Sequence, residues 1–160
     1  MAISQSTRVL FTRPSNATAY AAGDVIGTAD IAIHELTGVV ASDRYVMLQE
    51  AQLLIHVASV NAGMSGFRLH FYDSSPTAIL DNAPFDLVAG DRSRWLDEVE
   101  LPLPSDRGST LVSRVVYPGL VLKLAAASSS LFCQLETIGA YTPSSAAVYE
   151  IRARFLEMGL

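Results

Sequence analysis

The sequence contains a single cysteine, Cys133, which excludes an intrachain disulfide and a metal cluster held by thiolates. This cysteine lies in the apolar run of residues 131–135. A free cysteine in such surroundings behaves as a small buried hydrophobic residue, whereas a reactive thiol needs exposure and a cationic neighbourhood. We therefore predict that Cys133 packs in the core and does not act as a nucleophile.

Long apolar segments are also missing. The longest uncharged stretches are of strand length or are interrupted by serine and glycine, so none could span a bilayer as a helix. The first ten residues lack a basic segment leading into an apolar one, and we expect no signal peptide. The corresponding expectation is a protein made in the cytosol that stays there or is assembled there into something larger.

Lysine is nearly absent: Lys123 stands against ten arginines, and the formal net charge is −5. The arginines are scattered and acidic residues lie among them, as in residues 91–94 and 150–154. Nucleic-acid binding relies on clustered cations, and a membrane-surface anchor needs a polybasic segment, so neither partner is expected. Arginine in place of lysine is typical of protein interfaces.

The chain contains runs of residues that alternate between apolar and polar. In residues 148–158, Tyr149, Ile151, Ala153 and Phe155 face one way, whereas Glu150 and the arginines after it face the other. A period of two predicts a β-strand with one face on an apolar core. Further strands are predicted at residues 7–12, 31–36, 45–60, 67–73, 95–101, 109–117, 120–124 and 131–138. A bulge is expected near residues 50–52, and a hairpin through Pro118-Gly119.

These strands are evenly spaced, with no sustained helical period and no internal repeat, and half of the 160 residues are hydrophobic. The pattern predicts an all-β, antiparallel, jelly-roll-like β-sandwich. A long loop at residues 74–94 is expected to carry one or two short helical turns, because Pro76 and Pro84 each follow polar capping residues. We expect an N-terminal arm or edge strand at residues 1–14 and a single sandwich domain at residues 15–160.

The histidines, aspartates and serines of the sequence do not form a recognisable metal-binding or catalytic motif. His34, His56 and His70 lie on three separate predicted strands without the His-x-His pair of a cupin-like metal site. The aspartates of the 74–94 loop lack the spacing of a calcium loop, and no serine sits in a Gly-x-Ser-x-Gly elbow. We predict no catalytic residue, no metal site and no cofactor, and hence no enzyme.

Three stretches together resemble a known family. They are residues 20–27 (Tyr-Ala-Ala-Gly-Asp-Val-Ile-Gly), residues 62–85, with Ala62-Gly63-Met64 and Asp81-Asn82-Ala83-Pro84-Phe85, and residues 139–143 (Gly-Ala-Tyr-Thr-Pro). Their order and spacing resemble the head-decoration, or capsid cement, proteins of tailed bacteriophages. The likeness covers roughly residues 18–157 and rests on turns and core strands.

The resemblance implies a virion structural protein that decorates and stabilises the outer surface of a phage capsid by bridging major capsid protein subunits. It implies the major capsid protein as the partner, together with self-association as a homodimer or homotrimer. The protein would be synthesised in the host cytoplasm and would end on the outer capsid surface of the virion. No functional residue is carried over from the family.

Two segments are candidates for subunit contacts. Residues 1–13 could act as an arm, with Val9, Phe11 and Arg13 as contact residues, because Pro14 and a small-residue loop set this segment apart. The second candidate is the 74–94 loop with the strand after it, where Phe85, Arg92, Arg94 and Trp95 combine residue types that are frequent interface anchors. The alternative for the loop is that its aromatic residues plug the end of the sandwich.

A second function stays open at this point. A carbohydrate-binding or host-receptor-binding β-sandwich of a phage tail or fibre would have the same fold class. Aromatic residues beside aspartate and asparagine, as at Tyr72-Asp73 and Asp81-Asn82, would suit a shallow sugar site if they were exposed.

Overall fold

The computed structural model describes residues 4–40 and 44–159, and this part of the chain is folded mainly as β-strands. The strands in it are β1 (Ser4–Thr12), β2 (Val25–Ile26), β3 (His34–Leu36), β4 (Tyr45–Ile55), β5 (Phe67–Tyr72), β6 (Trp95–Leu101), β7 (Ser105–Asp106), β8 (Leu111–Val116), β9 (Val121–Lys123), β10 (Leu131–Thr137) and β11 (Val148–Met158). One short 3-10 helix, η1 (Ala89–Asp91), lies between β5 and β6. No helix within the described ranges is long and apolar enough to cross a membrane.

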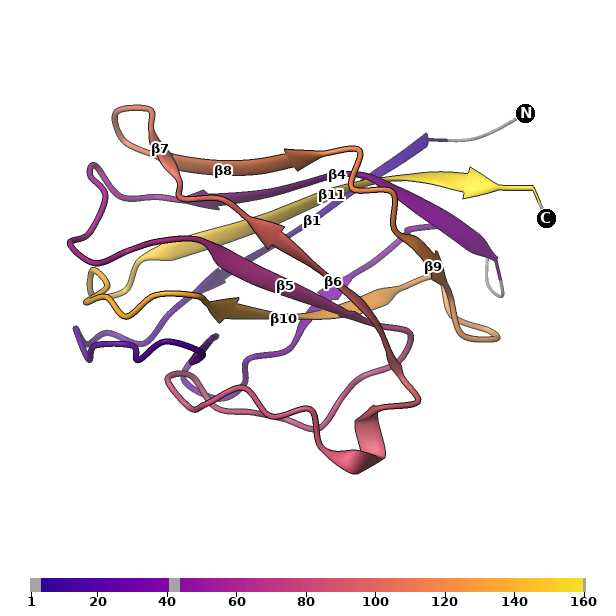
Figure 1. Cartoon of the computed structure of the whole chain (residues 1–160), viewed down its shortest axis with the longest axis horizontal. Helices are drawn as coiled ribbons and strands as arrows, with labels where there is room; N and C mark the ends of the chain where they lie inside the picture. The colour runs from indigo at the N-terminus through magenta and orange to yellow at the C-terminus, as the bar shows by residue number, and fades with distance from the viewer. Residues whose placement is uncertain (1–3, 41–43, 160) are drawn as a thin grey trace.

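The strands form two antiparallel sheets packed face to face (Figure 1). The larger sheet has the order β1-β11-β4-β8-β7, and β9 pairs with β4 beyond the end of β8. The smaller sheet has the order β2-β10-β5-β6, with β3 also paired to β10. Most neighbours in the sheets are far apart in sequence, as in jelly rolls, where long connections cross between sheets. The predicted all-β, antiparallel, jelly-roll-like sandwich is confirmed.

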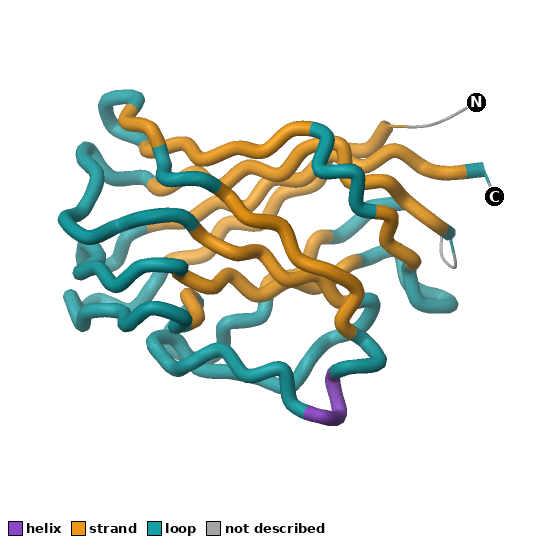
Figure 2. The backbone as a smooth tube through the Cα atoms, viewed as in Figure 1, coloured by secondary structure: helices purple, strands orange, loops and turns teal. Residues whose placement is uncertain are grey.

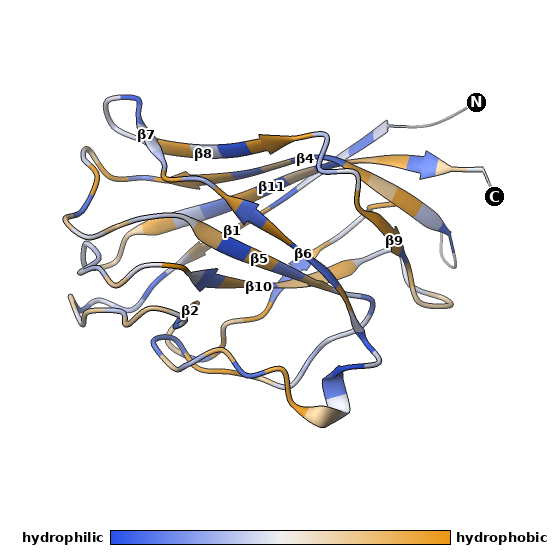
Figure 3. Cartoon of the chain, viewed as in Figure 1, coloured by the Kyte–Doolittle hydropathy of each residue, from blue (hydrophilic) through white to orange (hydrophobic). Residues whose placement is uncertain are grey.

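The core lies between the two sheets and is filled by alternate residues of the facing strands. Hydrophilic and hydrophobic residues follow one another along the strands in Figure 3. β11 turns Tyr149, Ile151 and Phe155 inward, as its period of two predicts. The ring of Phe155 meets that of Phe71 from β5 edge-on, with centroids 6.5 Å apart. Cys133 is fully buried, and burial raises the pKa of its thiol, so the prediction that it packs in the core is confirmed.

β1 is an edge strand of the larger sheet. It pairs with β11 over its whole length, from Ser4 opposite Leu156 to Thr12 opposite Val148. The first three residues of the expected arm lie outside the described residues. Residues 4–12 of that segment are therefore held within the chain by continuous strand pairing with β11. The use of the segment as an arm toward a neighbour stays a prediction.

The hairpin expected through Pro118-Gly119 is wrong. β8 and β9 pair with β4 one after the other instead of with each other. The cause is a bulge in β4, where Leu48 pairs with Phe155 and Glu50 with Arg154, which leaves Gln49 without a partner on β11. The backbone N–H of Tyr117 donates to Gln49 O at 2.6 Å, so the 117–120 turn loops out where the bulge lies. The bulge was expected one residue later.

The 74–94 loop is a long excursion, as predicted, and Figure 2 shows its one helical turn among extended segments. The turn is η1, whereas the segments after Pro76 and Pro84 are not helical, so their expected positions for helical turns are wrong. The reason is competition for backbone hydrogen bonds. Ile79 O accepts from the N–H of Ala32, and Phe85 N–H donates to Gly23 O, so the loop is held extended against residues 23–32.

Candidate interaction surfaces

The contact residues predicted in the first segment have very different environments. Val9 is half-buried, whereas Phe11 and Arg13 are buried inside the chain. The ring of Phe11 stacks on that of His34 with centroids 3.8 Å apart. Contact of Phe11 or Arg13 with a partner would first require β1 to leave its sheet.

Arg13 is buried at the corner after β1 and contacts several loops there. Its side chain has no exposed surface, and its Nε donates to the hydroxyl of Tyr20 at 3.1 Å. Its Nη1 donates to the carbonyls of Asn16 and Ser144, and its Nη2 lies 3.7 Å from Asp81 Oδ2. The Tyr20 hydroxyl in turn donates to Asp81 Oδ1 at 2.6 Å. The guanidinium therefore connects three loops in a largely buried network, in which the Asp81 side chain is only 7% exposed and each group has a charged or polar partner.

The three stretches that carry the family resemblance meet in space at this same corner. Tyr20 and Tyr141 exchange backbone hydrogen bonds, and Asp81 Oδ1 also accepts from the N–H of Gly27 at 2.9 Å. Gly63 has a φ of +84°, and a Cβ there would lie 2.5 Å from Ala140 O. These residues are needed for close packing between loops. The motifs therefore have a structural explanation in this chain.

Phe85 of the 74–94 loop packs on the smaller sheet, Trp95 is the first residue of β6 in that sheet, and both are half-buried. The ring of Phe85 lies parallel to that of His70 with centroids 3.9 Å apart, and Trp95 Nε1 donates to His70 Nδ1 at 3.4 Å. Arg92 and Arg94 are exposed, and Arg94 Nη1 donates to Ser75 O at 3.0 Å. The use of these residues at a subunit contact stays a prediction.

The carboxylates around His70 are already paired within the chain. His70 Nε2 lies 2.7 Å from Glu136 Oε2, and its Nδ1 lies 3.2 Å from Glu98 Oε2. Arg68 contacts Glu136 at 3.2 Å and Glu100 at 3.1 Å. The hydrogen bond to Glu100, together with the negative charges of Glu136 and Glu98, raises the pKa of Arg68. This cluster connects three glutamates of the smaller sheet to Arg68 and His70, and Glu100 stays 66% exposed.

The residues considered for a sugar site and for a metal site are not arranged for either. Tyr72 is buried and donates to Gln134 Oε1 at 2.8 Å, and Asp81 is engaged by Arg13. Across residues 4–40 and 44–159, no three His, Cys, Asp or Glu side chains are grouped so that they could hold a metal ion. His34 is buried, and desolvation lowers its pKa to about 4.

The outer face of the larger sheet carries a group of charged side chains that face solvent. In one line across four strands, Arg8 of β1 lies opposite Arg152 of β11, which lies opposite Gln52 of β4, which lies opposite Arg114 of β8. We call this line of three arginines and one glutamine the arginine row. Like charges directly opposite one another are unfavourable in a sheet. The neighbouring carboxylates offset this repulsion.

Glu150 lies beneath the arginine row and is nearly inaccessible although it is on the outer face. Arg152 Nε donates to its Oε1 at 2.6 Å, Arg8 Nη1 lies 3.5 Å from the same oxygen, and His56 Nε2 lies 3.6 Å from Oε2. The hydrogen bond from Arg152, with the charges of Arg152, Arg8 and His56, lowers the pKa of Glu150. One carboxylate thus fixes two guanidiniums side by side, with Arg8 still 66% exposed.

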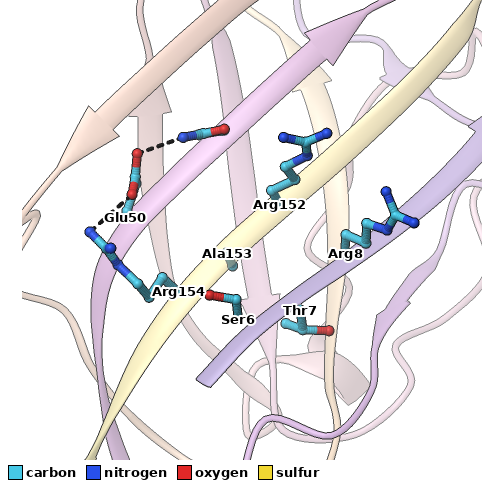
Figure 4. Close-up of a pocket in the computed structure, with 8 residues that line it drawn as sticks. Ser6, Thr7, Arg8, Glu50, Arg152, Ala153 and Arg154 are labelled. Carbon is cyan, nitrogen blue, oxygen red and sulfur yellow. Dashed lines mark hydrogen bonds and ion pairs between the residues drawn. The ribbon is translucent and has the colours of Figure 1, made fainter. Parts of the chain in front are cut away.

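Glu50 fixes the other two arginines of this face. Its Oε2 lies 3.1 Å from Arg154 Nη2, and its Oε1 lies 3.4 Å from Arg114 Nε. Between these charged groups lies a shallow depression of about 400 Å³, lined on the outer face by Ser6, Arg8, Glu50, Gln52, Arg152 and Arg154. Figure 4 shows the side chains of Arg8 and Arg152 extending to the same side, whereas that of Arg154 turns toward Glu50. Such a surface can hold anionic or hydrogen-bonding groups without any bond-making chemistry.

Sequence reasoning named none of the arginine row as a site. The sequence feature that points to this face is the alternation of arginines with inward residues in 150–154. By itself this alternation predicts only a face toward solvent or a partner. Arg8 pairs with Arg152 and Arg114 pairs with Gln52, residues more than sixty positions away in the sequence, so the alignment of these side chains depends on strand pairing.

No family model and no curated protein sequence matches the chain. Among solved structures, the capsid of Ralstonia phage GP4 is similar at 15% identity and a TM-score of 0.44, over 98% of this chain and 86% of that one. The capsid asymmetric unit of cyanophage Pam1 is similar at 10% identity and a TM-score of 0.36, over 97% and 84%. Desmodium yellow mottle tymovirus gives 9% identity and a TM-score of 0.31, over 98% and 87%. At these scores the likeness carries no conclusion about the chain's role, and its fold class rests on its own two sheets.

Proposed function

We propose that this chain is a virion structural protein that decorates the outer surface of a bacteriophage capsid and stabilises it by bridging major capsid protein subunits. The observation that supports this most directly is the outer face of the larger sheet, where arginines are fixed in place by Glu50 and Glu150. Ordered arginines on a lysine-poor surface are typical of protein–protein contacts. The family resemblance of the loop motifs points in the same direction.

The proposed mechanism is additive. A decorating protein adds contact area across a seam between capsid subunits, so that expansion or internal pressure must break more contacts. Each contact could be weak, because many copies bind to one symmetric particle and their contributions accumulate. The chain would act either as a homodimer or as a homotrimer. It would be made in the host cytoplasm and would bind the shell from outside.

The charge distribution argues for a protein partner. With a net charge of −5 and a few arginines already contacted by carboxylates, the chain has little to offer a phosphate backbone. The sugar-binding alternative loses its sequence support, because Tyr72 is buried and Asp81 is engaged by Tyr20 and Arg13 within the chain itself.

Co-sedimentation with mature, undecorated heads of the phage that encodes the chain tests the proposal. We expect saturable binding at a fixed ratio to the major capsid protein, with the ratio indicating which symmetry sites are filled. The folded state of the sample is checked in parallel by circular dichroism. A folded protein that stays in the supernatant at every concentration contradicts the proposal, and clear hits on a glycan array would then favour the receptor-binding function.

A further inference from the structure

The outer face of the larger sheet continues from the arginine row into an apolar area near the ends of β4 and β11. Two residues along the strands from the row, Arg154 lies opposite Glu50, and beyond the bulge Leu156 lies opposite Met47, which lies opposite Val121. Val121 is half exposed. The next line places Tyr45 opposite Lys123, whose ammonium group lies 5.6 Å from the tyrosine ring. The face therefore has a charged half and an apolar half on one continuous surface.

Tyr117 stands out on this surface, in the turn between β8 and β9. Tyr117 is 73% exposed as a residue, and its neighbour Val116 is 43% exposed. Its φ is +52°, a left-handed conformation that is unfavourable for an aromatic residue. Strain of this kind persists at binding sites more often than elsewhere. A strained, exposed tyrosine at the border between the two halves has the features of an interface anchor.

The charges on the face determine which partner fits it. Its four arginines, Arg8, Arg114, Arg152 and Arg154, are contacted by two glutamates, Glu50 and Glu150, so these arginines outnumber their carboxylate partners by two. Two charges are too few for a nucleic acid on a chain whose net charge is −5.

We propose that this two-part face is the docking surface for another protein, which presents carboxylates opposite the arginine row and an apolar seat for Tyr117. Glu150 and Glu50 hold the guanidiniums in position before the partner arrives, which reduces the ordering cost of docking. The proposal deepens the proposed function, since on a capsid the partner would be an acidic surface of the shell. It assigns this face to the shell and the smaller sheet to the outside.

The test uses two charge variants of the full chain. Arg8→Gln/Arg114→Gln removes the two most exposed guanidiniums and leaves the close contacts of Glu150 with Arg152 and of Glu50 with Arg154 intact. Arg92→Gln/Arg94→Gln removes the same number of charges from the 74–94 loop, the second segment that the sequence predicts as a subunit contact. We expect the first variant to bind undecorated heads about tenfold more weakly and the second to bind like the unmodified chain. A third variant, Tyr117→Asn, suits the left-handed backbone, so we expect weaker binding at an unchanged or higher melting temperature.

A second readout does not depend on heads. Backbone NMR shifts are mapped during titration with poly-L-glutamate and, separately, with a short single-stranded DNA at low salt. We expect poly-L-glutamate to shift residues of β1, β11, β4 and β8, and the Arg8→Gln/Arg114→Gln variant to lose these shifts. If heads do not bind but this map appears, the proposed function fails and the docking surface stands.

Three results would overturn the docking surface itself. The first is equal head binding by the Arg8→Gln/Arg114→Gln variant and the unmodified chain. The second is an absent or displaced poly-L-glutamate map, or a stronger response of the same face to DNA. The third is concentration-dependent self-association in sedimentation equilibrium that the Arg8→Gln/Arg114→Gln variant abolishes, which would assign the face to a second copy.

Discussion

Replacing Arg13 with alanine is expected to lower the free energy of unfolding by about 3–5 kcal/mol, the cost of removing one partner from a buried ion pair. Without the guanidinium, Asp81 stays buried beside the Tyr20 hydroxyl with no positive charge near it. The carbonyls of Asn16 and Ser144 lose a donor as well. Chemical denaturation at neutral pH, followed by far-UV circular dichroism, measures the loss.

A double-variant cycle separates the buried network from simple loss of volume. Arg13→Met keeps most of the side-chain volume, and Asp81→Asn removes the charge that would be left unpaired. Because removing both charges leaves no buried ion alone, we expect the double variant to be less destabilised than the sum of the two single variants by at least about 1 kcal/mol. Additive losses, or a loss below about 1 kcal/mol for Arg13→Ala, would contradict the role of Arg13 as the buried ion-pair partner of Asp81.

The parts of the fold that the sequence predicts well are those governed by local alternation. β6 spans the residues predicted for it, and β11 turns its predicted apolar residues inward, because a period of two leaves only one choice of face. Pro102 directly follows β6, where proline cannot continue the ladder. In these places the residues themselves fix both the element and its orientation.

The wrong predictions arise where contacts distant in sequence decide the outcome. Local alternation places His70 and Tyr72 on an outward face, yet both are buried because the 74–94 loop folds over that face. Nothing near Arg13 in the sequence indicates an intrachain partner, but Asp81, nearly seventy residues later, lies 3.7 Å from it in the folded chain. The pairing of β8 and β9 with β4 follows from the bulge at Gln49, whose position a strand pattern specifies only roughly.

The arginine row illustrates the same limit for the candidate site. Arg152 is visible as an outward residue in the sequence, but its neighbours Arg8 and Arg114 reach it only through the order β1-β11-β4-β8. A shift of β1 by one residue would turn Arg8 inward and separate the pair. Strand order and register, rather than composition, therefore create the charged surface. Composition supplies only the choice of arginine over lysine, which gives planar donors suited to carboxylates.

Acidification from pH 7 to pH 5 is expected to destabilise the chain by about 2 kcal/mol through His34 alone. Desolvation lowers the pKa of the folded-state imidazole to about 4, whereas an unfolded histidine titrates near 6.5. Between these values the unfolded state binds the extra proton, so stability is complete above pH 6.5 and is lost as the pH falls toward 4, to a total of about 3 kcal/mol. Denaturation midpoints at a series of pH values measure this window.

The variant His34→Phe isolates the effect, because phenylalanine retains the stacking on Phe11 but cannot be protonated. It loses the contact of His34 Nε2 with Ile26 O at 3.1 Å, so we expect lower stability at pH 7 but a much smaller loss between pH 7 and pH 5. His56→Gln removes a more exposed histidine and should keep most of the pH dependence. The lowered pKa of Glu150 acts in a separate window, since stability from that carboxylate is lost only as the pH falls below its ordinary value. A His34→Phe variant as sensitive to acid as the unmodified chain would mean that other groups carry the destabilisation, and that His34 can be protonated without leaving the core.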